Sequence, residues 1–512
     1  MSVMAVELDA SRLLAPYFSS SQIVWTIIIG TIMIAMALGN IYGGRTADKD
    51  PNPDKLYGRI LIASIWIALI PVVGKYIIIG ISALLIFTVS NNFLIIAAFA
   101  ACMVIFVFPL FLLGTVTPSL VKYSVDSLDD NGKTVGTLGA ANTIGSIIGT
   151  FVPTFVTIPA VGTSITFLVF AGILLVLSII YFVSMHTGKK KMVVSTLAFI
   201  LCCVLGYSDS FAFWESDLTY EGESIYNYLQ VYENDKEIAL STNVLFGVQS
   251  VYMKEDKLTG MYYDYAMAAP LMIKGKPLED LDVLILGMGT GTYATQCRKY
   301  FGPMSMEGVE IDKKITDLSR QYFSLSDKVP VTTYDGRAFL HATDKKYDVI
   351  MVDAYQDITI PFQMSSLEFF TLVKDHLTDD GVMVVNMNMR GDKEGNINQY
   401  LADTIGHVFD AEYVVDVKGS TNRELFASAN QDILQNLTDN TSGLDNEELK
   451  NMMAYVGENM TSYDKGDYVL TDDKAPVELL GMQVIDEMIK DEVAYYKGIY
   501  EEKGIQGLLD YL

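Results

Sequence analysis

The run Val283-Leu284-Ile285-Leu286-Gly287-Met288-Gly289-Thr290-Gly291-Thr292 decides the fold of the second half of the chain. An apolar strand leads directly into three alternating glycines, and a helical pattern follows. Glycine permits a tight turn and lets a ligand approach the backbone closely. Nineteen residues after Gly291, a second predicted strand ends in Glu310, whose carboxylate is placed to bind ribose hydroxyls. This spacing predicts nucleoside binding in a doubly wound sheet, with a plain structural turn as the alternative.

Strand and helix patterns alternate around this loop. Residues 220–265 have period-two segments separated by polar turns, which predict a small antiparallel sheet. The later strands are separated by helical patterns, as in a parallel sheet. They are predicted at 283–286, 305–310, 329–334, 347–353 and 381–387. Residues 430–465 are rich in Asn and Asp and are interpreted as a surface excursion, whereas the tail from 478 is predicted to be mostly helical.

Nearly all the long apolar runs lie in residues 1–207. A membrane-spanning helix needs about 20 apolar residues. Candidate spans lie at 22–42, 58–80, 93–118, 134–158 and 163–184, with a short one at 192–207. We therefore predict three parts: a multi-pass transmembrane helical region (1–207), a small antiparallel β domain (208–280) and a Rossmann-like α/β domain with a doubly wound sheet (281–512).

Lys and Arg gather in three loops, at 45–55, 122–133 and 189–191, and the positive-inside rule puts these loops in the cytoplasm. The side of the second half depends on the segment 192–207, whose 16 residues span only about 24 Å of a core about 30 Å thick. Asn-x-Ser/Thr sites at Asn436, Asn440 and Asn459 are compatible with the outside. We give a slight preference to an extracytoplasmic location, although a nucleoside donor made in the cytosol favours the other side.

The chain of 512 residues has 61 acidic and 36 basic side chains, a formal net charge of −25. Nucleic acids are bound chiefly through Lys and Arg, so this balance argues against nucleic-acid partners. It is compatible with a cationic substrate. None of the four histidines belongs to a paired ligand motif, and we predict no metal site.

Residues 220–390 resemble spermidine synthase and its aminopropyltransferase relatives. The whole chain is similar to members in which several membrane helices precede such a domain. The resemblance implies that Gly287, Gly289 and Gly291 wrap an adenosyl donor and that Glu310 binds its ribose. It further implies that Asp335-Gly336 binds the adenine amino group. Tyr262 and Asp264 match a Tyr-x-Glu element beside the donor, and Asn227 falls at a polar donor contact, although Tyr262 could equally be a core aromatic.

The fourth strand ends in Asp353, which matches the family Asp that accepts the proton of the attacking amine. A carboxylate suits this work because it stabilises an ammonium group and can take its proton. The family's second acid at this place is replaced by Gln356, and Asp357 is one residue out of position. An Asp that only caps a turn is the alternative for Asp353.

Thr290 occupies the position of a family Asp that binds the amino end of the decarboxylated donor. An Asp would attract a lone ammonium and repel the carboxylate of intact S-adenosylmethionine, whereas Thr is neutral. The co-substrate is therefore expected to be decarboxylated S-adenosylmethionine or S-adenosylmethionine itself.

The leading hypothesis is a membrane-anchored aminopropyltransferase that acts on a small amine or polyamine. One alternative is an S-adenosylmethionine-dependent methyltransferase that acts on a membrane or surface acceptor. Another is a transporter whose soluble domain senses a nucleoside or a polyamine. It is suggested by the loop Gly43-Gly44-Arg45-Thr46-Ala47-Asp48, which resembles a loop of major-facilitator carriers. The lipid bilayer is an expected partner, and a homodimer is left open.

Overall fold

The structure is a computed structural model that forms two compact units. It describes residues 1–18, 21–86, 89, 92–124, 131–208, 210–213, 215, 218–243, 248–355, 360–388, 390–391 and 393–509. The first unit comprises Met1–Ser216, Glu221–Tyr228 and Asn243–Leu245, and the second comprises Asp217–Tyr220, Leu229–Thr242 and Phe246–Leu512.

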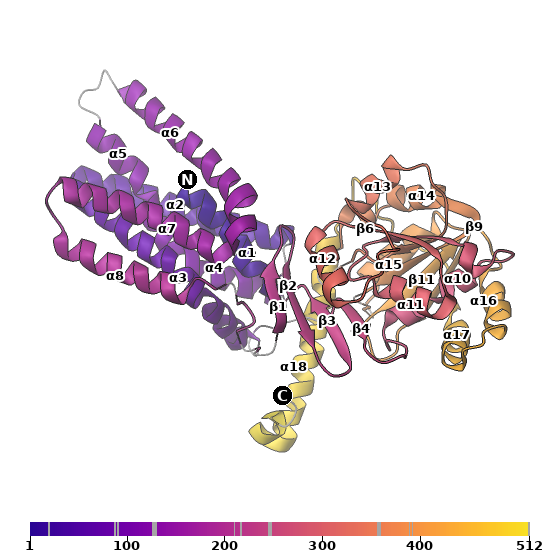
Figure 1. Cartoon of the computed structure of the whole chain (residues 1–512). Helices are drawn as coiled ribbons and strands as arrows, with labels where there is room; N and C mark the ends of the chain where they lie inside the picture. The colour runs from indigo at the N-terminus through magenta and orange to yellow at the C-terminus, as the bar shows by residue number, and fades with distance from the viewer. Residues whose placement is uncertain are drawn as a thin grey trace. The chain divides into compact units, whose positions relative to one another are not determined.

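The first unit is helical (Figure 1). Its helices are α1 (Ser2–Phe18), α2 (Gln22–Lys49), α3 (Pro53–Leu85), α4 (Phe93–Gly114), α5 (Val116–Ser124), α6 (Asn131–Val152), a π-helical turn (Pro153–Thr157), α7 (Ile158–Ser184) and α8 (Lys189–Leu205). Four helical stretches in the described chain are long and apolar enough to cross a membrane: Gln22–Lys49, Pro53–Leu85, Phe93–Ser124 and Gly132–Ser184. The last has 53 residues and is interrupted at Gly162, whose φ is +81°, near the boundary expected between two spans. Helix α8, with 17 residues, is shorter than all four.

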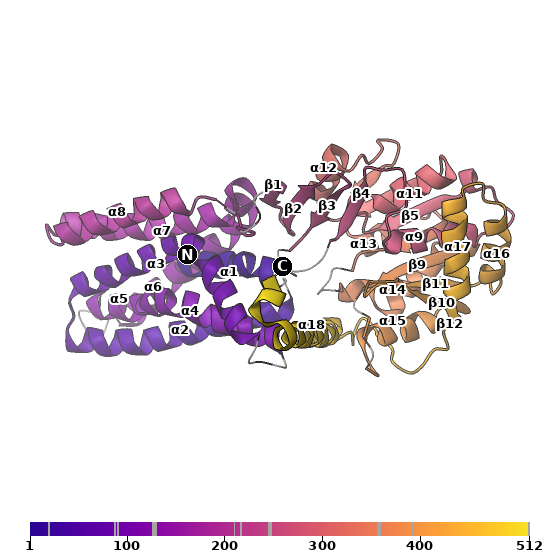
Figure 2. The same ribbon diagram turned by 90° about the horizontal axis from the view of Figure 1, so that it is seen from below.

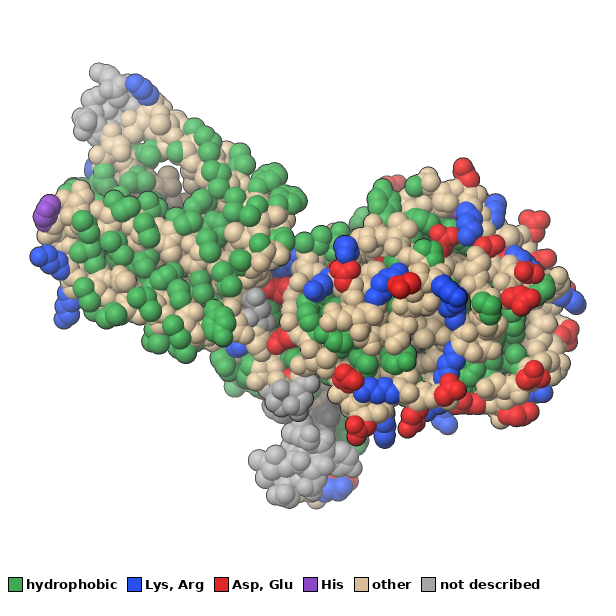
Figure 3. Space-filling model, viewed as in Figure 1, with side chains coloured by type: hydrophobic (Ala, Val, Ile, Leu, Met, Phe, Trp, Pro, Cys, Tyr) green, Lys and Arg blue, Asp and Glu red, His purple; other side chains and the backbone are tan. Residues whose placement is uncertain are grey.

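The surface of the helical unit agrees with a membrane environment. Hydrophobic side chains cover most of the face seen in Figure 3, and Lys and Arg gather at one end of it. Many large apolar residues on the long helices are exposed, among them Met33, Leu84, Phe155 and Ile180. Soluble proteins rarely expose so much contiguous apolar surface. The unit is therefore suited to contact with lipid.

Glycines bring α2 and α4 into close contact. A Cβ at Gly39 would lie 2.3 Å from the carbonyl oxygen of Phe111, and one at Gly114 would lie 2.8 Å from that of Met36. Gly43 packs in the same way against Thr115. Small residues at such contacts let apolar helices approach closely in lipid. The glycine-rich part of α2 therefore serves close packing of α2 against α4.

The end of the hairpin formed by β1 (Leu218–Glu223) and β2 (Tyr228–Glu233) belongs to the first unit and is held by α1 and α7. Glu223 accepts hydrogen bonds from the backbone N–H and the hydroxyl of Thr163, at 2.9 and 2.8 Å. The Arg12 guanidinium donates to the carbonyl oxygens of Ser224, at 3.1 Å, and of Ile225. Charge-assisted bonds of this kind are stronger than neutral ones. They attach the hairpin to the helices.

Two sheets follow the helices. The first is four-stranded, in the order β1-β2-β3-β4, and the second is eight-stranded, in the order β12-β10-β11-β9-β8-β5-β6-β7. The first contains β1 (Leu218–Glu223), β2 (Tyr228–Glu233), β3 (Glu237–Ser241) and β4 (Ser250–Met253). The second contains β5 (Asp282–Leu286), β6 (Ser305–Glu310), β7 (Val331–Thr333), β8 (Tyr347–Val352), β9 (Leu377–Met387), β10 (Ala411–Asp416), β11 (Arg423–Ser428) and β12 (Thr461–Ser462). Strands β5 to β9 pair in parallel, whereas β11 and β10 extend the sheet antiparallel, so the predicted α/β class is confirmed.

Helices cover both faces of the large sheet (Figure 2). One face packs on α9 (Tyr262–Ala266), α10 (Ala268–Leu271), α11 (Thr292–Phe301), α16 (Ile433–Ser442) and α17 (Glu447–Asn459), and the other on α13 (Gly336–Ala342), α14 (Leu367–Asp375) and α15 (Ile397–Gly406). Helix α12 (Lys313–Tyr322) packs on β6, and two short 3-10 turns span Leu278–Asp280 and Phe362–Met364. The helical tail is α18 (Val477–Leu509), as predicted.

Residues 430–465 are not a surface excursion, and that prediction is wrong. Helices α16 and α17 bury Leu437, Leu449, Met453 and Val456 in the core. Their apolar residues are few but spaced at helical intervals, so each helix has one buried stripe. The first Asn-x-Ser/Thr site is part of this packing: Asn436 is 2% exposed and its amide donates to the Met272 carbonyl oxygen. It therefore gives no support to an outside location.

Candidate active site

The first glycine of the loop packs against the strand end that carries Asp353. Gly287 has a φ of +86°, and a Cβ there would lie 2.4 Å from the carbonyl oxygen of Asp353. Strands β5, β6, β7 and β8 are parallel, so their carboxyl ends meet at one edge of the sheet. Gly287, Glu310, Asp335 and Asp353 follow or end these four strands. The fold therefore brings the predicted loop and the predicted acids to one edge.

Glu310 holds the middle of the glycine loop. Its Oε2 accepts from the Gly289 backbone N–H at 2.8 Å, and its Oε1 accepts from the Asp312 N–H at 3.0 Å. The side chain is 7% exposed, and burial raises the pKa of Glu310 to about 7 against the opposing effect of these backbone donors. Gly289 has a φ of +54°, which glycine adopts easily. A carboxylate at the end of the second strand is suitably placed for a ribose.

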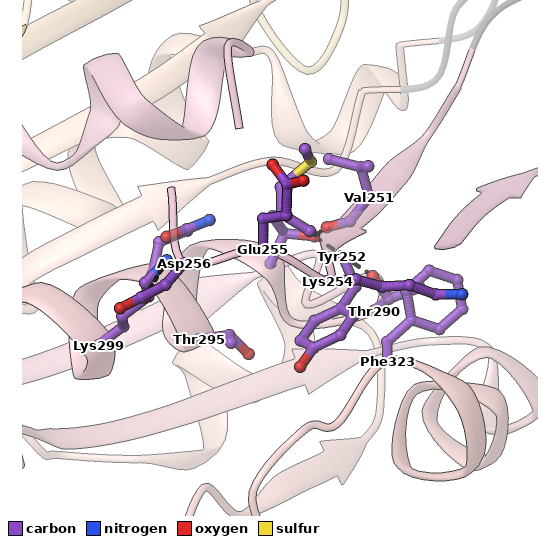
Figure 4. Close-up of a pocket in the computed structure, with 12 residues that line it drawn as sticks. Val251, Tyr252, Lys254, Glu255, Asp256, Thr290, Thr295, Lys299 and Phe323 are labelled. Carbon is purple, nitrogen blue, oxygen red and sulfur yellow. Dashed lines mark hydrogen bonds and ion pairs between the residues drawn. The ribbon is translucent and has the colours of Figure 1, made fainter. Parts of the chain in front are cut away.

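Thr290 is buried between the loop and β4. It is 1% exposed, its backbone N–H donates to Ser250 Oγ at 3.3 Å, and its Oγ1 lies 3.4 Å from Thr292 Oγ1. Thr292 in turn donates to the Val251 carbonyl oxygen at 2.7 Å. A 180 Å³ pocket opens beside these residues (Figure 4). It is lined by Val251, Tyr252, Met253, Lys254, Glu255, Asp256, Thr290, Thr292, Thr295, Gln296, Lys299 and Phe323.

Two further predicted residues shape the same edge. Gly291 has a φ of +82° and a Cβ there would lie 2.6 Å from Leu325 Cδ1, so glycine is needed for the start of α11. Asp335 is the N-cap of α13, and its Oδ1 accepts from the Ala338 N–H at 2.8 Å. Gly336 is the first residue of that helix. Asp335 thus caps the helix through Oδ1, and its Oδ2 is left as a further acceptor.

Asp353 is oriented by two neutral donors. The Tyr262 hydroxyl donates to its Oδ2 at 2.8 Å, and the Asn386 amide donates to its Oδ1 at 2.9 Å. Burial raises the pKa of Asp353 to about 7, although both hydrogen bonds favour the carboxylate and act in the opposite direction. A carboxyl group with this pKa can gain or lose a proton near neutral pH.

Sequence reasoning missed the residues that complete this network. Asn386 lies near the end of β9, and its side-chain oxygen accepts from the Asn422 amide at 2.8 Å. Asn422 directly precedes β11, which pairs antiparallel with β9. A polar residue in the apolar run 382–387 was the available signal for Asn386. The sequence held no comparable signal for Asn422, because the position of this residue depends on the pairing of distant strands.

The Tyr-x-Asp element separates into two roles. Tyr262 is 7% exposed, so it is both a buried aromatic and a partner of Asp353. Asp264 is used elsewhere: it accepts from the hydroxyl and N–H of Thr259, at 2.9 and 3.1 Å, and from the Gly260 N–H at 2.6 Å. These bonds fix the turn before α9. Asp264 therefore positions the helix that carries Tyr262.

The structure does not relate three further predicted residues to this cluster. Asn227 lies in the turn between β1 and β2, where its backbone N–H donates to Ser224 Oγ at 2.8 Å, and that turn belongs to the first compact unit. Gln356 and Asp357 lie outside the described residues. No group of three or more His, Cys, Asp or Glu residues in the described ranges could hold a metal ion.

Comparison with known proteins assigns the family. Residues 261–416 match the family model described as the spermine/spermidine synthase domain. A probable polyamine aminopropyl transferase of Bifidobacterium longum is 51% identical over 348 residues, which cover 65% of this chain and 77% of that protein. A polyamine aminopropyltransferase of Vibrio vulnificus is 28% identical over 199 residues, which cover 37% of this chain and 65% of that protein.

Among solved structures, spermidine synthase from Thermotoga maritima is 18% identical, with a TM-score of 0.37 over 45% of this chain and 79% of that one. The extent and identity of the match to the Bifidobacterium protein decide the family. The chain belongs to the polyamine aminopropyltransferase family, whose members include spermidine synthase.

Proposed function

We propose that this protein transfers an aminopropyl group from decarboxylated S-adenosylmethionine to a small primary amine, with Asp353 as the proton acceptor. The observation that carries the proposal is the Asp353 carboxylate, half-buried at the carboxyl edge of the sheet and oriented by Tyr262 and Asn386. It lies against Gly287, the first residue of the nucleoside loop. The proton acceptor and the donor loop are thus neighbours.

The reaction would proceed by direct displacement. The amine nitrogen uses its lone pair to attack the methylene carbon bonded to the donor sulfur. The carbon–sulfur bond breaks, its electron pair returns to sulfur, and the sulfonium becomes a neutral thioether. The extra proton on the new secondary ammonium passes to Asp353 and then to solvent. Positioning of the two substrates and the negative field of Asp353 supply most of the rate.

The donor would be held by the loop and the acids around it. Positive φ values at Gly287, Gly289 and Gly291 let the backbone turn closely around the nucleoside. Glu310 would accept from the ribose hydroxyls, and Asp335 with Gly336 would bind the adenine amino group. Asn227 stays a predicted donor contact. These roles fit a donor with an adenosine moiety. Titration of methylthioadenosine into the wild type and into the Glu310→Gln variant tests them.

Thr290 favours a second candidate, methyl transfer from intact S-adenosylmethionine. Its neutral hydroxyl, next to the Thr292 hydroxyl, would tolerate the donor carboxylate that an Asp would repel. The two candidates differ in product: an aminopropylated amine with methylthioadenosine, or a methylated acceptor with S-adenosylhomocysteine. Incubation of the full-length protein in detergent with each donor and 1,4-diaminobutane, followed by mass spectrometry, separates them. Formation of S-adenosylhomocysteine alone would overturn aminopropyl transfer.

We further propose that the four long apolar stretches anchor the enzyme in a membrane. The support is their length and the exposed apolar side chains along them. The membrane helices would then keep the enzyme beside the bilayer, and fractionation of cells with an alkaline carbonate wash tests whether the chain stays in the membrane pellet.

A further inference from the structure

Glu424 is a buried acid that the proposed function does not use. It lies in β11, is 0% exposed, and neither of its carboxylate oxygens has a hydrogen-bond partner in the part of the chain that the structure describes. Burial of a polar group without a partner destabilises the folded state. An apolar residue would fill a purely structural position in this strand at less cost. Glu424 is therefore a candidate for a ligand contact.

The sheet register places Glu424 beside the proposed proton acceptor. Glu424 is directly opposite Asn386 in the antiparallel β9–β11 pair, so the two side chains stand on the same face of the sheet, with Cβ atoms about 5 Å apart. Asn386 is the residue that donates to Asp353. Burial and then the charge of Asp353 raise the pKa of Glu424 well above its ordinary value. In the protein alone, burial therefore favours the protonated form of Glu424.

Both substrates carry ammonium groups that need a negative partner. The donor tail ends in an ammonium group, and a diamine acceptor brings a second ammonium at its distal end. By the resemblance to aminopropyltransferases, Thr290 and Gln356 occupy the positions of acids that bind these two groups. Asp353 serves the reacting nitrogen. Glu424 offers a further carboxyl group on the same face of the sheet.

We propose that Glu424 binds a primary ammonium group of a substrate, at the donor tail or at the distal end of a diamine acceptor, and releases its proton to solvent as the ammonium binds. The proposal rests on aminopropyl transfer as the proposed function. The proton balance is simple: a neutral carboxylic acid and an ammonium become a carboxylate–ammonium pair and one proton in solvent. The pair replaces an unpartnered acid by a charge-assisted hydrogen bond.

The test compares Glu424→Gln with a matched control, Glu412→Gln, in the full-length protein in detergent. Glu412 lies in the neighbouring strand β10, is 6% exposed, and also has no partner for its carboxylate oxygens among the described residues. It is opposite Ala427, so its side chain stands on the other face of the sheet. Both variants replace one buried carboxyl group by an amide of nearly the same shape. Only Glu424→Gln makes this change on the face of the sheet that carries Asp353.

Two substrate pairs distinguish the sources of the ammonium. For the acceptor arm, 1,4-diaminobutane is compared with butylamine, which lacks the second amine. For the donor arm, decarboxylated S-adenosylmethionine is compared with the S-methylated sulfonium of methylthioadenosine, which keeps the positive sulfur and lacks the amine tail. We expect Glu424→Gln to raise KM or Kd at least 10-fold in one of the two arms. The increase should be seen only for the compound of that pair that carries the additional ammonium group. Calorimetry in two buffers of different ionisation enthalpy should show that this variant releases one proton fewer on binding that compound.

Three outcomes would overturn the inference. These are unchanged constants and proton release in Glu424→Gln, an equal loss for both members of each pair, or the same changes in Glu412→Gln. Failure of the proposed function has a different signature. In that case the wild type transfers no group to any amine. The binding constants of the two donor compounds, and the protons released when they bind, still decide the role of Glu424.

Discussion

The hydroxyl of Tyr262 donates a 2.8 Å hydrogen bond to Oδ2 of Asp353, across 91 positions of sequence. The bond joins the small helix α9 to the end of β8 and orients the carboxylate that would take the proton. It also favours the ionised form, because a donor stabilises a carboxylate.

Removal of that hydroxyl should slow transfer while donor binding remains. In Tyr262→Phe we expect kcat to fall about 10-fold, the value of one hydrogen bond to a charged group. The pKa of Asp353 should rise, so the acidic limb of the kcat profile should move to higher pH. Steady-state kinetics from pH 6 to 9 measure both. A lower kcat with an unmoved limb would assign Tyr262 to packing alone.

Replacement of Asp353 by Asn should abolish transfer and leave the affinity for methylthioadenosine largely intact. In the wild type the carboxylate is the active form, so activity should rise with pH through about 7. The raised pKa also means that the folded state holds the proton longer than the unfolded state does. The wild type therefore loses stability as pH rises from about 4 to about 7, and Asp353→Asn should be no less stable than the wild type at pH 8. Near wild-type turnover in the variant would make Asp353 a turn residue.

Glu310→Gln should weaken binding of any adenosyl donor by about 1–3 kcal/mol, because the variant loses charge-assisted bonds to the ribose and to the Gly289 N–H. Calorimetry with methylthioadenosine measures the effect. Asp264→Asn is a useful control, because Asp264 holds the turn before α9. Unchanged affinity in Glu310→Gln would remove this carboxylate from the donor site.

Thr290→Asp should shift donor preference toward decarboxylated S-adenosylmethionine. At about 4–5 Å and an effective dielectric near 20, one charge pair is worth roughly 3–4 kcal/mol before screening reduces it. Even a third of that value changes the ratio of the two affinities several-fold. Competition between the two donors for one binding signal measures the ratio. If the ratio does not move, the donor tail does not approach position 290.

The three Lys/Arg-rich loops should share one side of the membrane. Single cysteines at Asn52, Asp130 and Gly188, introduced after the native cysteines are replaced, should all resist a membrane-impermeant thiol reagent in intact cells. A cysteine at Ser442, in the second unit and exposed, reports the side of the catalytic domain in the same assay. Labelling of only one or two of the three loop positions would break the assignment of spans.

Local patterns predicted the parts of this protein that local chemistry determines. Strand β6 is found at the predicted 305–310, and the three loop glycines have the positive φ values that their pattern implied. The positions of Asn422 and Glu424 could not be predicted, because they depend on the register of β11 on β9. Arg423-Glu424-Leu425-Phe426 reads as an ordinary strand with its charges in solvent, yet Glu424 is wholly buried. The helices at 433–459 were missed because their few apolar residues are diluted by Asn and Asp.

The missing Cβ of Gly287 has a consequence for how this family can diversify. Because that atom would strike the Asp353 carbonyl oxygen, the nucleoside loop and the proton acceptor form one inseparable block. Thr290, which would meet the donor tail in the proposed function, is held by hydrogen bonds to Ser250 and Thr292 rather than by a backbone contact with Asp353. A change of donor through position 290 would therefore leave the geometry between the loop and Asp353 unaltered.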